Sequence, residues 1–184
     1  MGDATPSPPR PPVPRGLWVV LALGIASIGS RPWLATLDQI PMTADGRMWL
    51  ERGDPGAEGW AEWVFRTRHF HVGYRPVAAL TYSATMAVTG PVPGVLRATD
   101  LALHLAVALT LALLARRIAP RAPPWSAALA GLLYLLHPVA EDVVPYVARR
   151  SYTLSLLFVL LAQLLLLRRA AGVGASLGDR KSVV

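Results

Sequence analysis

The chain has 184 residues, of which 53% are hydrophobic and 16% charged, and it contains no Cys. An average soluble domain carries about 25% charged residues, so this composition argues against an ordinary soluble enzyme and favours an integral membrane protein. The net charge of +7 does not indicate a nucleic-acid partner. Nearly all of the basic residues are Arg, and they are scattered in ones and twos between apolar runs instead of being clustered with aromatic residues.

Five apolar stretches follow one another along the chain, at residues 17–29, 76–90, 101–115, 125–138 and 152–167. Each is shorter than the roughly 20 residues that a full membrane span needs, so flanking residues must complete it. Residues 101–115 and 154–167 are apolar nearly all round, which disfavours a soluble helical bundle. We therefore expect an all-α integral membrane protein, a polytopic helical bundle.

The expected organisation begins with a Pro/Arg-rich arm and an uncleaved first helix, because no clear A-x-A cleavage site follows the first apolar run. The segments are a cytoplasmic arm (1–15), a transmembrane helix (16–30), an outer loop with amphipathic helices (31–75), an interfacial, re-entrant or transmembrane helix (76–90), transmembrane helices (95–117 and 122–138), an outer loop (139–151), a transmembrane helix (152–168) and a tail (169–178).

Arginine placement orients these segments, since short cytoplasmic loops gather Lys and Arg. The N-terminal arm, Arg116–Arg121 and Arg168–Arg169 all lie inside only if residues 76–90 do not cross the membrane. That stretch is the most polar of the five and ends in the helix-breaking run Gly90-Pro-Val-Pro-Gly94. We therefore favour four crossings, a cytoplasmic N-terminus and an interfacial or re-entrant segment at 76–90.

This topology brings the two loops 31–75 and 139–151, which hold eight of the eleven acidic residues, to the same outer side. In the first loop, Trp49, Trp60 and Trp63 stand among charges, a pattern of amphipathic helices in the headgroup region or of a simple aromatic belt. Asp45 precedes a Gly, which is typical of a turn. The pair His69 and His71 supplies two nitrogens, too few for a metal site, so no metal is predicted there.

The second loop carries adjacent carboxylates, Glu141 and Asp142, followed by the paired Arg149 and Arg150. Such charges at a membrane boundary are costly to desolvate unless they neutralise one another or serve a function. Asp142 and Arg149 are seven residues apart and would share a helix face, so a structural ion pair is the alternative to a functional site. His104 is expected to pack between helices.

Three segments together carry a family resemblance: Tyr74-Arg75-Pro76, residues 100–104, and His137-Pro138-x-x-x-Asp142-x-Val144 with Arg150. They resemble the N-terminal membrane region of polytopic GT-C glycosyltransferases, in particular the tetratricopeptide-repeat transmembrane O-mannosyltransferases and their bacterial relatives. The resemblance covers about residues 74–167.

The chain departs from the family pattern at several positions. The acidic pair of the first outer loop is reduced to Asp45, and the Glu of the second motif is Asp142. The Gly before the motif's Arg is Arg149, and the acid two residues after it is Tyr152. These departures leave open a changed specificity or a loss of activity.

The resemblance implies transfer of a mannose-like sugar from a polyprenyl-phosphate donor to a hydroxyl of an acceptor protein or glycan on the outer face of a bacterial inner membrane. Asp45 would be the general base. Arg150, then Arg75 and Arg149, would hold the phosphate. Glu141 and Asp142 would orient the acceptor, the arginines or a divalent cation. The lipid bilayer is the remaining expected partner, and no other cofactor is expected.

Proteins of this family have many more membrane helices, so the resemblance also implies an N-terminal fragment, inactive alone, of an active parent enzyme. Lys181 is the only Lys, and we expect residues 179–184 to be a non-native terminus. Two alternatives stay open: a non-catalytic membrane scaffold or accessory protein, and a small transporter with intramembrane charges at Arg97 and Asp100. The transporter ranks last because the sequence has no internal repeat.

Overall fold

The computed structural model describes residues 22, 44–65, 75–137 and 149–179. Within these ranges the chain is helical and forms no strand, so the expected all-α class is confirmed for them. The helices are α2 (Ala44–Arg52), α3 (Trp60–Phe65), α4 (Pro76–Thr89), α5 (Pro93–Ile118), α6 (Pro124–Leu136) and α8 (Arg150–Asp179). The helix expected at 16–30 lies outside the described residues, apart from residue 22.

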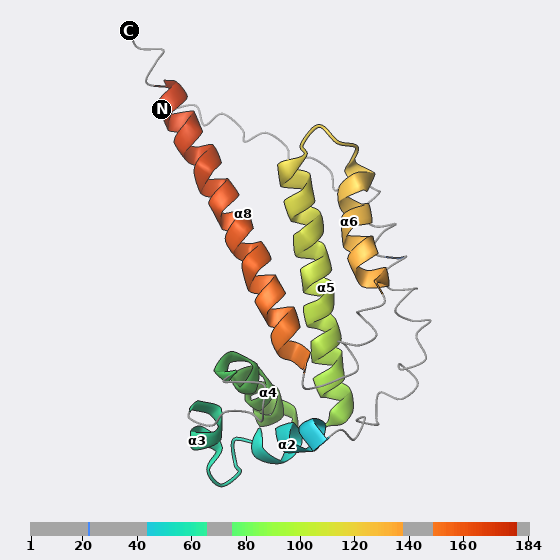
Figure 1. Cartoon of the computed structure of the whole chain (residues 1–184), viewed down its shortest axis with the longest axis vertical. Helices are drawn as coiled ribbons and strands as arrows, with labels where there is room; N and C mark the ends of the chain where they lie inside the picture. Colours follow the sequence, from blue (N-terminus) through green and yellow to red (C-terminus); the bar gives the residue numbers. More distant parts are fainter. Residues whose placement is uncertain (1–21, 23–43, 66–74, 138–148, 180–184) are drawn as a thin grey trace, which may run out of the picture.

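The helices form two layers (Figure 1). The helices α5, α6 and α8 lie side by side, with α5 contacting both α6 and α8. The helices α2, α3 and α4, none longer than 14 residues, form a short-helix layer across the end at which α5 and α8 begin. Both α5 and α8 run away from this short-helix layer, whereas α6 runs back towards it.

Local sequence signals set the helix boundaries. Pro76, Pro93 and Pro124 each occupy the first helical position, where the missing N–H costs nothing. Gly90 ends α4 with a φ of 71°, a conformation that residues with a Cβ rarely adopt. These three helices begin and end within two residues of the ranges expected at 76–90, 95–117 and 122–138.

The last helix differs from its expected range. The sequence predicts a tail at 169–178, but α8 continues through Asp179. This segment contains no Pro, the strongest helix breaker, and its three Ala residues favour a helix as much as its three glycines oppose it, so no local signal ends α8 at residue 168.

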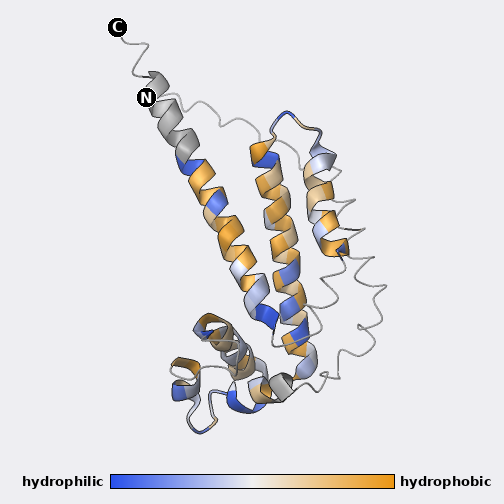
Figure 2. Cartoon of the chain, in the orientation of Figure 1, coloured by the Kyte–Doolittle hydropathy of each residue, from blue (hydrophilic) through white to orange (hydrophobic). Residues whose placement is uncertain are grey.

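Two of the described helices are long and apolar enough to cross a membrane, namely Pro93–Ile118 and Arg150–Arg169. At 1.5 Å per residue, a 20-residue helix is about 30 Å long, which matches the hydrocarbon core of a bilayer. α6 is apolar but has only 13 residues. Only 22% of the apolar window of α8 is buried, so most of its hydrophobic surface (Figure 2) contacts no other part of the described chain.

The short-helix layer has its own aromatic core. Trp49 and Trp63 are each 3% exposed and meet edge to face with ring centroids 5.1 Å apart, and Tyr82 lies 4.9 Å from Trp49. The Ser83 hydroxyl accepts a hydrogen bond of 2.8 Å from Trp60 Nε1 and donates one of 2.7 Å to the Gly53 carbonyl. Trp49 and Trp63 are therefore core residues, an arrangement that neither the headgroup nor the aromatic-belt interpretation anticipated.

The seam between α5 and α6 depends on a close backbone approach. A Cβ placed on Gly131 would lie 2.7 Å from the Ala108 carbonyl oxygen and 3.4 Å from the Ala112 Cβ. Small side chains on both helices thus let the two backbones come together at this point, and Leu135 is buried beside Ala108.

Candidate functional site

A buried ion pair joins α4, α5 and α8 where the two layers meet. Arg150, the first residue of α8, donates from Nε to the Asp100 Oδ1 of α5 at 2.5 Å and from Nη2 to the Leu96 carbonyl at 3.1 Å. The side chains of Arg150 and Asp100 are 0% and 6% exposed. The guanidinium carbon lies 3.7 Å from the centroid of the Tyr82 ring of α4, a cation–π contact.

Two further buried groups surround this pair. Arg97 precedes Asp100 by one helical turn, is 1% exposed and adds a second positive charge that acts on the carboxylate. Burial, followed by the Asp100 charge, raises the pKa of the Tyr82 phenol well above its ordinary value, so this ring stays neutral. The second oxygen of Asp100, Oδ2, makes no hydrogen bond to any described residue.

His104 lies one turn further along the same face of α5. Its Nδ1 is 2.9 Å from the Tyr134 hydroxyl of α6, and the two rings lie 4.5 Å apart. His104 is 3% exposed, so the prediction that it packs between helices is confirmed. Arg97, Asp100 and His104 thus form a buried polar stripe along a mostly apolar helix, in which Asp100 is joined to α8 and His104 to α6.

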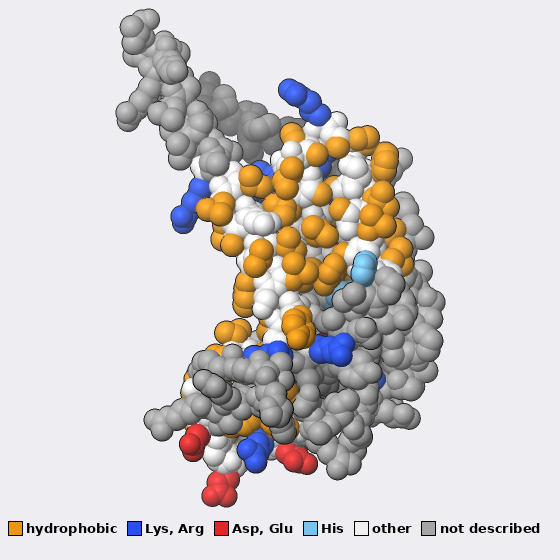
Figure 3. All heavy atoms as spheres, in the orientation of Figure 1, with side chains coloured by type: hydrophobic (Ala, Val, Ile, Leu, Met, Phe, Trp, Pro, Cys, Tyr) orange, Lys and Arg blue, Asp and Glu red, His pale blue; other side chains and the backbone are white. Residues whose placement is uncertain are grey.

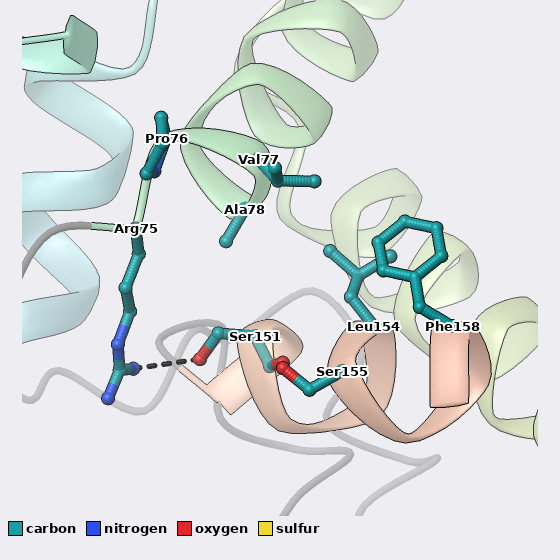
Figure 4. Close-up of a pocket in the computed structure, with 8 residues that line it drawn as sticks. All are labelled: Arg75, Pro76, Val77, Ala78, Ser151, Leu154, Ser155 and Phe158. Carbon is teal, nitrogen blue, oxygen red and sulfur yellow. Dashed lines mark hydrogen bonds between the residues drawn. The ribbon is translucent and has the colours of Figure 1, made fainter. Parts of the chain in front are cut away.

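A pocket opens beside the ion pair, between the start of α4 and the first two turns of α8 (Figure 4). Its volume is about 250 Å³, and among the described residues that line it Arg75 is the only charged one. Arg75 Nη1 donates a 2.8 Å hydrogen bond to the Ser151 hydroxyl, and the guanidinium lies 5.3 Å from the centroid of the Tyr152 ring. The remaining lining residues are Pro76, Val77, Ala78, Leu154, Ser155 and Phe158.

The structure brings together two of the predicted phosphate ligands, Arg75 and Arg150, although they are 75 residues apart in the chain. Arg75 contacts Ser151, the residue that follows Arg150, while Arg149 directly precedes α8 and is half-buried. Their surroundings differ. Arg150 is enclosed by protein groups, whereas Arg75 is half-buried and lines an open pocket.

Of the three carboxylates predicted for the site, only Asp45 lies within the described residues. Asp45 falls within α2, so it belongs to the first turn of a helix and not to an isolated turn. Its role as a base stays a prediction. Glu141 and Asp142 lie outside the described residues, and so do His69 and His71. The divalent cation suggested near Glu141 and Asp142 and the Asp142–Arg149 ion pair therefore stay predictions.

The sequence did not reveal that Asp100 is the partner of Arg150. A signal was present, because Asp100 is the single acidic residue in the 26-residue apolar helix α5. An ionisable residue within such a helix is expected to find an opposite charge. Which Arg it finds depends on how α8 packs against α5, and spacing along the chain does not encode that.

A scan against protein-family models, a search of curated proteins and a search of solved structures each found no match to this chain.

Proposed function

We propose that the chain is the N-terminal membrane region of a GT-C type glycosyltransferase, which moves a mannose-like sugar from a polyprenyl-phosphate donor to an acceptor hydroxyl on the outer face. The observation that carries this proposal is the position of Arg75, which lines a pocket at the first turn of α8, next to the buried ion pair of Arg150. Both arginines belong to the segments that resemble the family. A departing lipid phosphate needs a cation within reach of the membrane surface, and Arg suits this task because its planar fork binds phosphate bidentately.

The charge distribution supports an outer location for this site. Arg116 and Arg117 lie in the last turn of α5 and Arg121 follows it, while Arg168 and Arg169 lie about two thirds of the way along α8. In Figure 3, acidic side chains gather at the opposite end of the molecule, over the short-helix layer, where Glu51, Glu58 and Glu62 are exposed. Under the rule that arginine-rich ends face the cytoplasm, α5 and α8 would cross the membrane and the short-helix layer would lie outside.

In this proposal Arg150 and Arg75 have different roles. Arg150 already has Asp100, the Leu96 carbonyl and the Tyr82 ring as partners, so it fixes the start of α8. Arg75 lines the pocket and has the exposure that a phosphate ligand needs. The order of preference from the sequence, with Arg150 first, is thus reversed in the proposal. Asp45 stays the proposed base.

A non-catalytic membrane scaffold is the second candidate. The mutual neutralisation of Asp100 and Arg150 favours it, because a buried ion pair can serve purely to fix helix packing. A small transporter stays third.

The test is photo-cross-linking of the chain in native membranes with a photoreactive polyprenyl-phosphate mannose. We expect labelling that unlabelled donor competes away and that Arg75→Ala weakens at least tenfold. The control Arg121→Ala, at the other end of the bundle, should label normally. Labelling no stronger than that of a photoreactive neutral lipid would overturn the glycosyltransferase proposal in favour of the scaffold.

A further inference from the structure

The pocket between α4 and α8 combines polar and apolar features in a fixed order. Arg75 and the Ser151 hydroxyl stand together at one side, joined by their 2.8 Å hydrogen bond. Ser155 lies one helical turn further, with its hydroxyl donating to the Ser151 carbonyl at 2.8 Å. Beyond it come Leu154 and Phe158, the apolar part of the lining. A ligand that fits this order has an anionic head and a hydrocarbon neck.

The volume limits how much of such a ligand the pocket can enclose. Pockets that bury a drug-sized ligand measure about 300–1,000 Å³, and the 250 Å³ here falls just below that range. At about 30 Å³ per water molecule, the space equals about eight waters. This space is enough for a phosphate and the first few carbons of a chain.

The rest of the ligand's hydrocarbon chain would have a continuous apolar path along α8. Phe158 is 53% exposed at the pocket edge, and Leu161 and Leu165 follow it at helical spacing with exposures of 41% and 57%. These residues belong to the apolar window of α8 that is long enough to cross a bilayer. A hydrocarbon chain leaving the pocket would thus run along an apolar helix face at the depth of the acyl chains.

We propose that this pocket binds the head of a phosphate-bearing membrane amphiphile, with the phosphate on Arg75 and Ser151, the neck against Leu154 and Phe158, and the chain along α8. Arg75 contributes two parallel N–H donors, and the Ser151 hydroxyl donates its proton while still accepting from Arg75. The inference deepens the proposed function, since it concerns the same Arg75. The shared chemistry is a phosphate ester on a long chain, whether polyprenyl phosphate or a phospholipid.

The test measures binding to the purified chain in a phosphate-free maltoside detergent by native mass spectrometry. Four probes are compared: polyprenyl monophosphate, phosphatidic acid, uncharged polyprenol and inorganic phosphate. We expect the phosphate amphiphiles to bind at least tenfold more tightly than either polyprenol or inorganic phosphate, because only they satisfy both halves of the pocket. Comparable binding of polyprenol would overturn the inference.

Paired variants locate the site. Ser155→Leu, which fills the pocket, and Phe158→Ala should each weaken binding at least fivefold. Val159→Ala is the matched control, because Val159 is also 53% exposed but does not line the pocket. All three positions are exposed, so helix content by circular dichroism should not change.

The outcomes separate this inference from the proposed function. Phosphatidic acid binding as tightly as polyprenyl phosphate, with loss in Ser155→Leu, supports the pocket and argues against a dedicated sugar-donor site. If both pocket variants bind polyprenyl phosphate as tightly as the unaltered chain does, the pocket inference is overturned and the donor proposal stands. No binding of either amphiphile overturns both.

Discussion

The ion pair between Asp100 and Arg150 makes a quantitative prediction about stability. Both side chains are almost completely removed from solvent, at 6% and 0% exposed. Removing one partner of a buried pair leaves an uncompensated charge, at a cost of about 3–5 kcal/mol. In Asp100→Leu, Arg150 keeps the Leu96 carbonyl and the Tyr82 ring, so we expect a loss of about 3 kcal/mol, the lower end of that range.

The double variant Asp100→Leu/Arg150→Met removes both charges together. Replacing a buried ion pair by apolar residues of similar volume is often neutral. We therefore expect the double variant to lose about 1 kcal/mol at most, less than either single variant, because no buried charge is left uncompensated when the contacts with the Leu96 carbonyl, Thr81 and the Tyr82 ring disappear. Since Arg150→Met alone would also cost about 3 kcal/mol or more, the coupling energy between the two positions would be at least about 5 kcal/mol.

The assay is unfolding of the full chain in maltoside micelles by titration with sodium dodecyl sulfate, followed by tryptophan fluorescence. Trp49 and Trp63 report on the short-helix layer, because both are buried beside Tyr82. The matched control Arg117→Met removes an exposed Arg from the same bundle and should change stability by less than 0.5 kcal/mol. Additive losses from the two single variants would refute the ion pair as the link between α5 and α8.

Three further predictions follow from the packing and the charge pattern. Gly131→Ala should destabilise the α5–α6 seam by about 1–3 kcal/mol in the same unfolding assay, because its Cβ would meet the Ala108 carbonyl oxygen at 2.7 Å; an unchanged midpoint would contradict this contact. Trp60→Phe should cost about 1 kcal/mol, the net value of its 2.8 Å hydrogen bond to α4, and a loss above 3 kcal/mol would mean that packing and not the hydrogen bond dominates. Reporter fusions at Gly94 and Arg121 should report opposite sides of the membrane, with Arg121 cytoplasmic, and a cytoplasmic Gly94 would show that the α4 segment crosses.

The sequence predicted the existence and the approximate bounds of α4, α5 and α6 because their limits are local. Each apolar run is closed by Pro or Gly, and the physical effect of these residues does not depend on distant partners. α8 was harder to delimit, because its apolar run passes into a segment of mixed Ala and Gly that contains no Pro.

The site was only partly predictable, for a reason that Trp49 and Asp100 illustrate. An aromatic residue among charges suits a membrane interface as well as a protein core, and only the packing of α4 against α2 and α3 makes Trp49 a core residue. Likewise, an acid in an apolar helix signals that a partner exists but not which one. Both outcomes depend on how the helices pack against one another. A hydrophobic pattern without a polar face does not specify this packing.

The difference in burial between Arg75 and Arg150 decides which of them can meet a ligand. To bind phosphate, Arg150 would have to give up Asp100, and the unpaired buried carboxylate left behind would cost several kcal/mol. Arg75 donates to a neutral hydroxyl, a bond worth about 1 kcal/mol net, and its half-buried side chain lines the pocket, where a bidentate contact with phosphate would be charge-assisted and stronger. The two arginines therefore have different roles. Arg150 holds α8 against α4 and α5, and this packing forms the pocket in which Arg75 can bind a ligand. On this reasoning, Arg150→Met combined with Asp100→Leu should preserve phosphate-amphiphile binding within about threefold, whereas Arg75→Gln should abolish it while lowering stability by only about 1 kcal/mol.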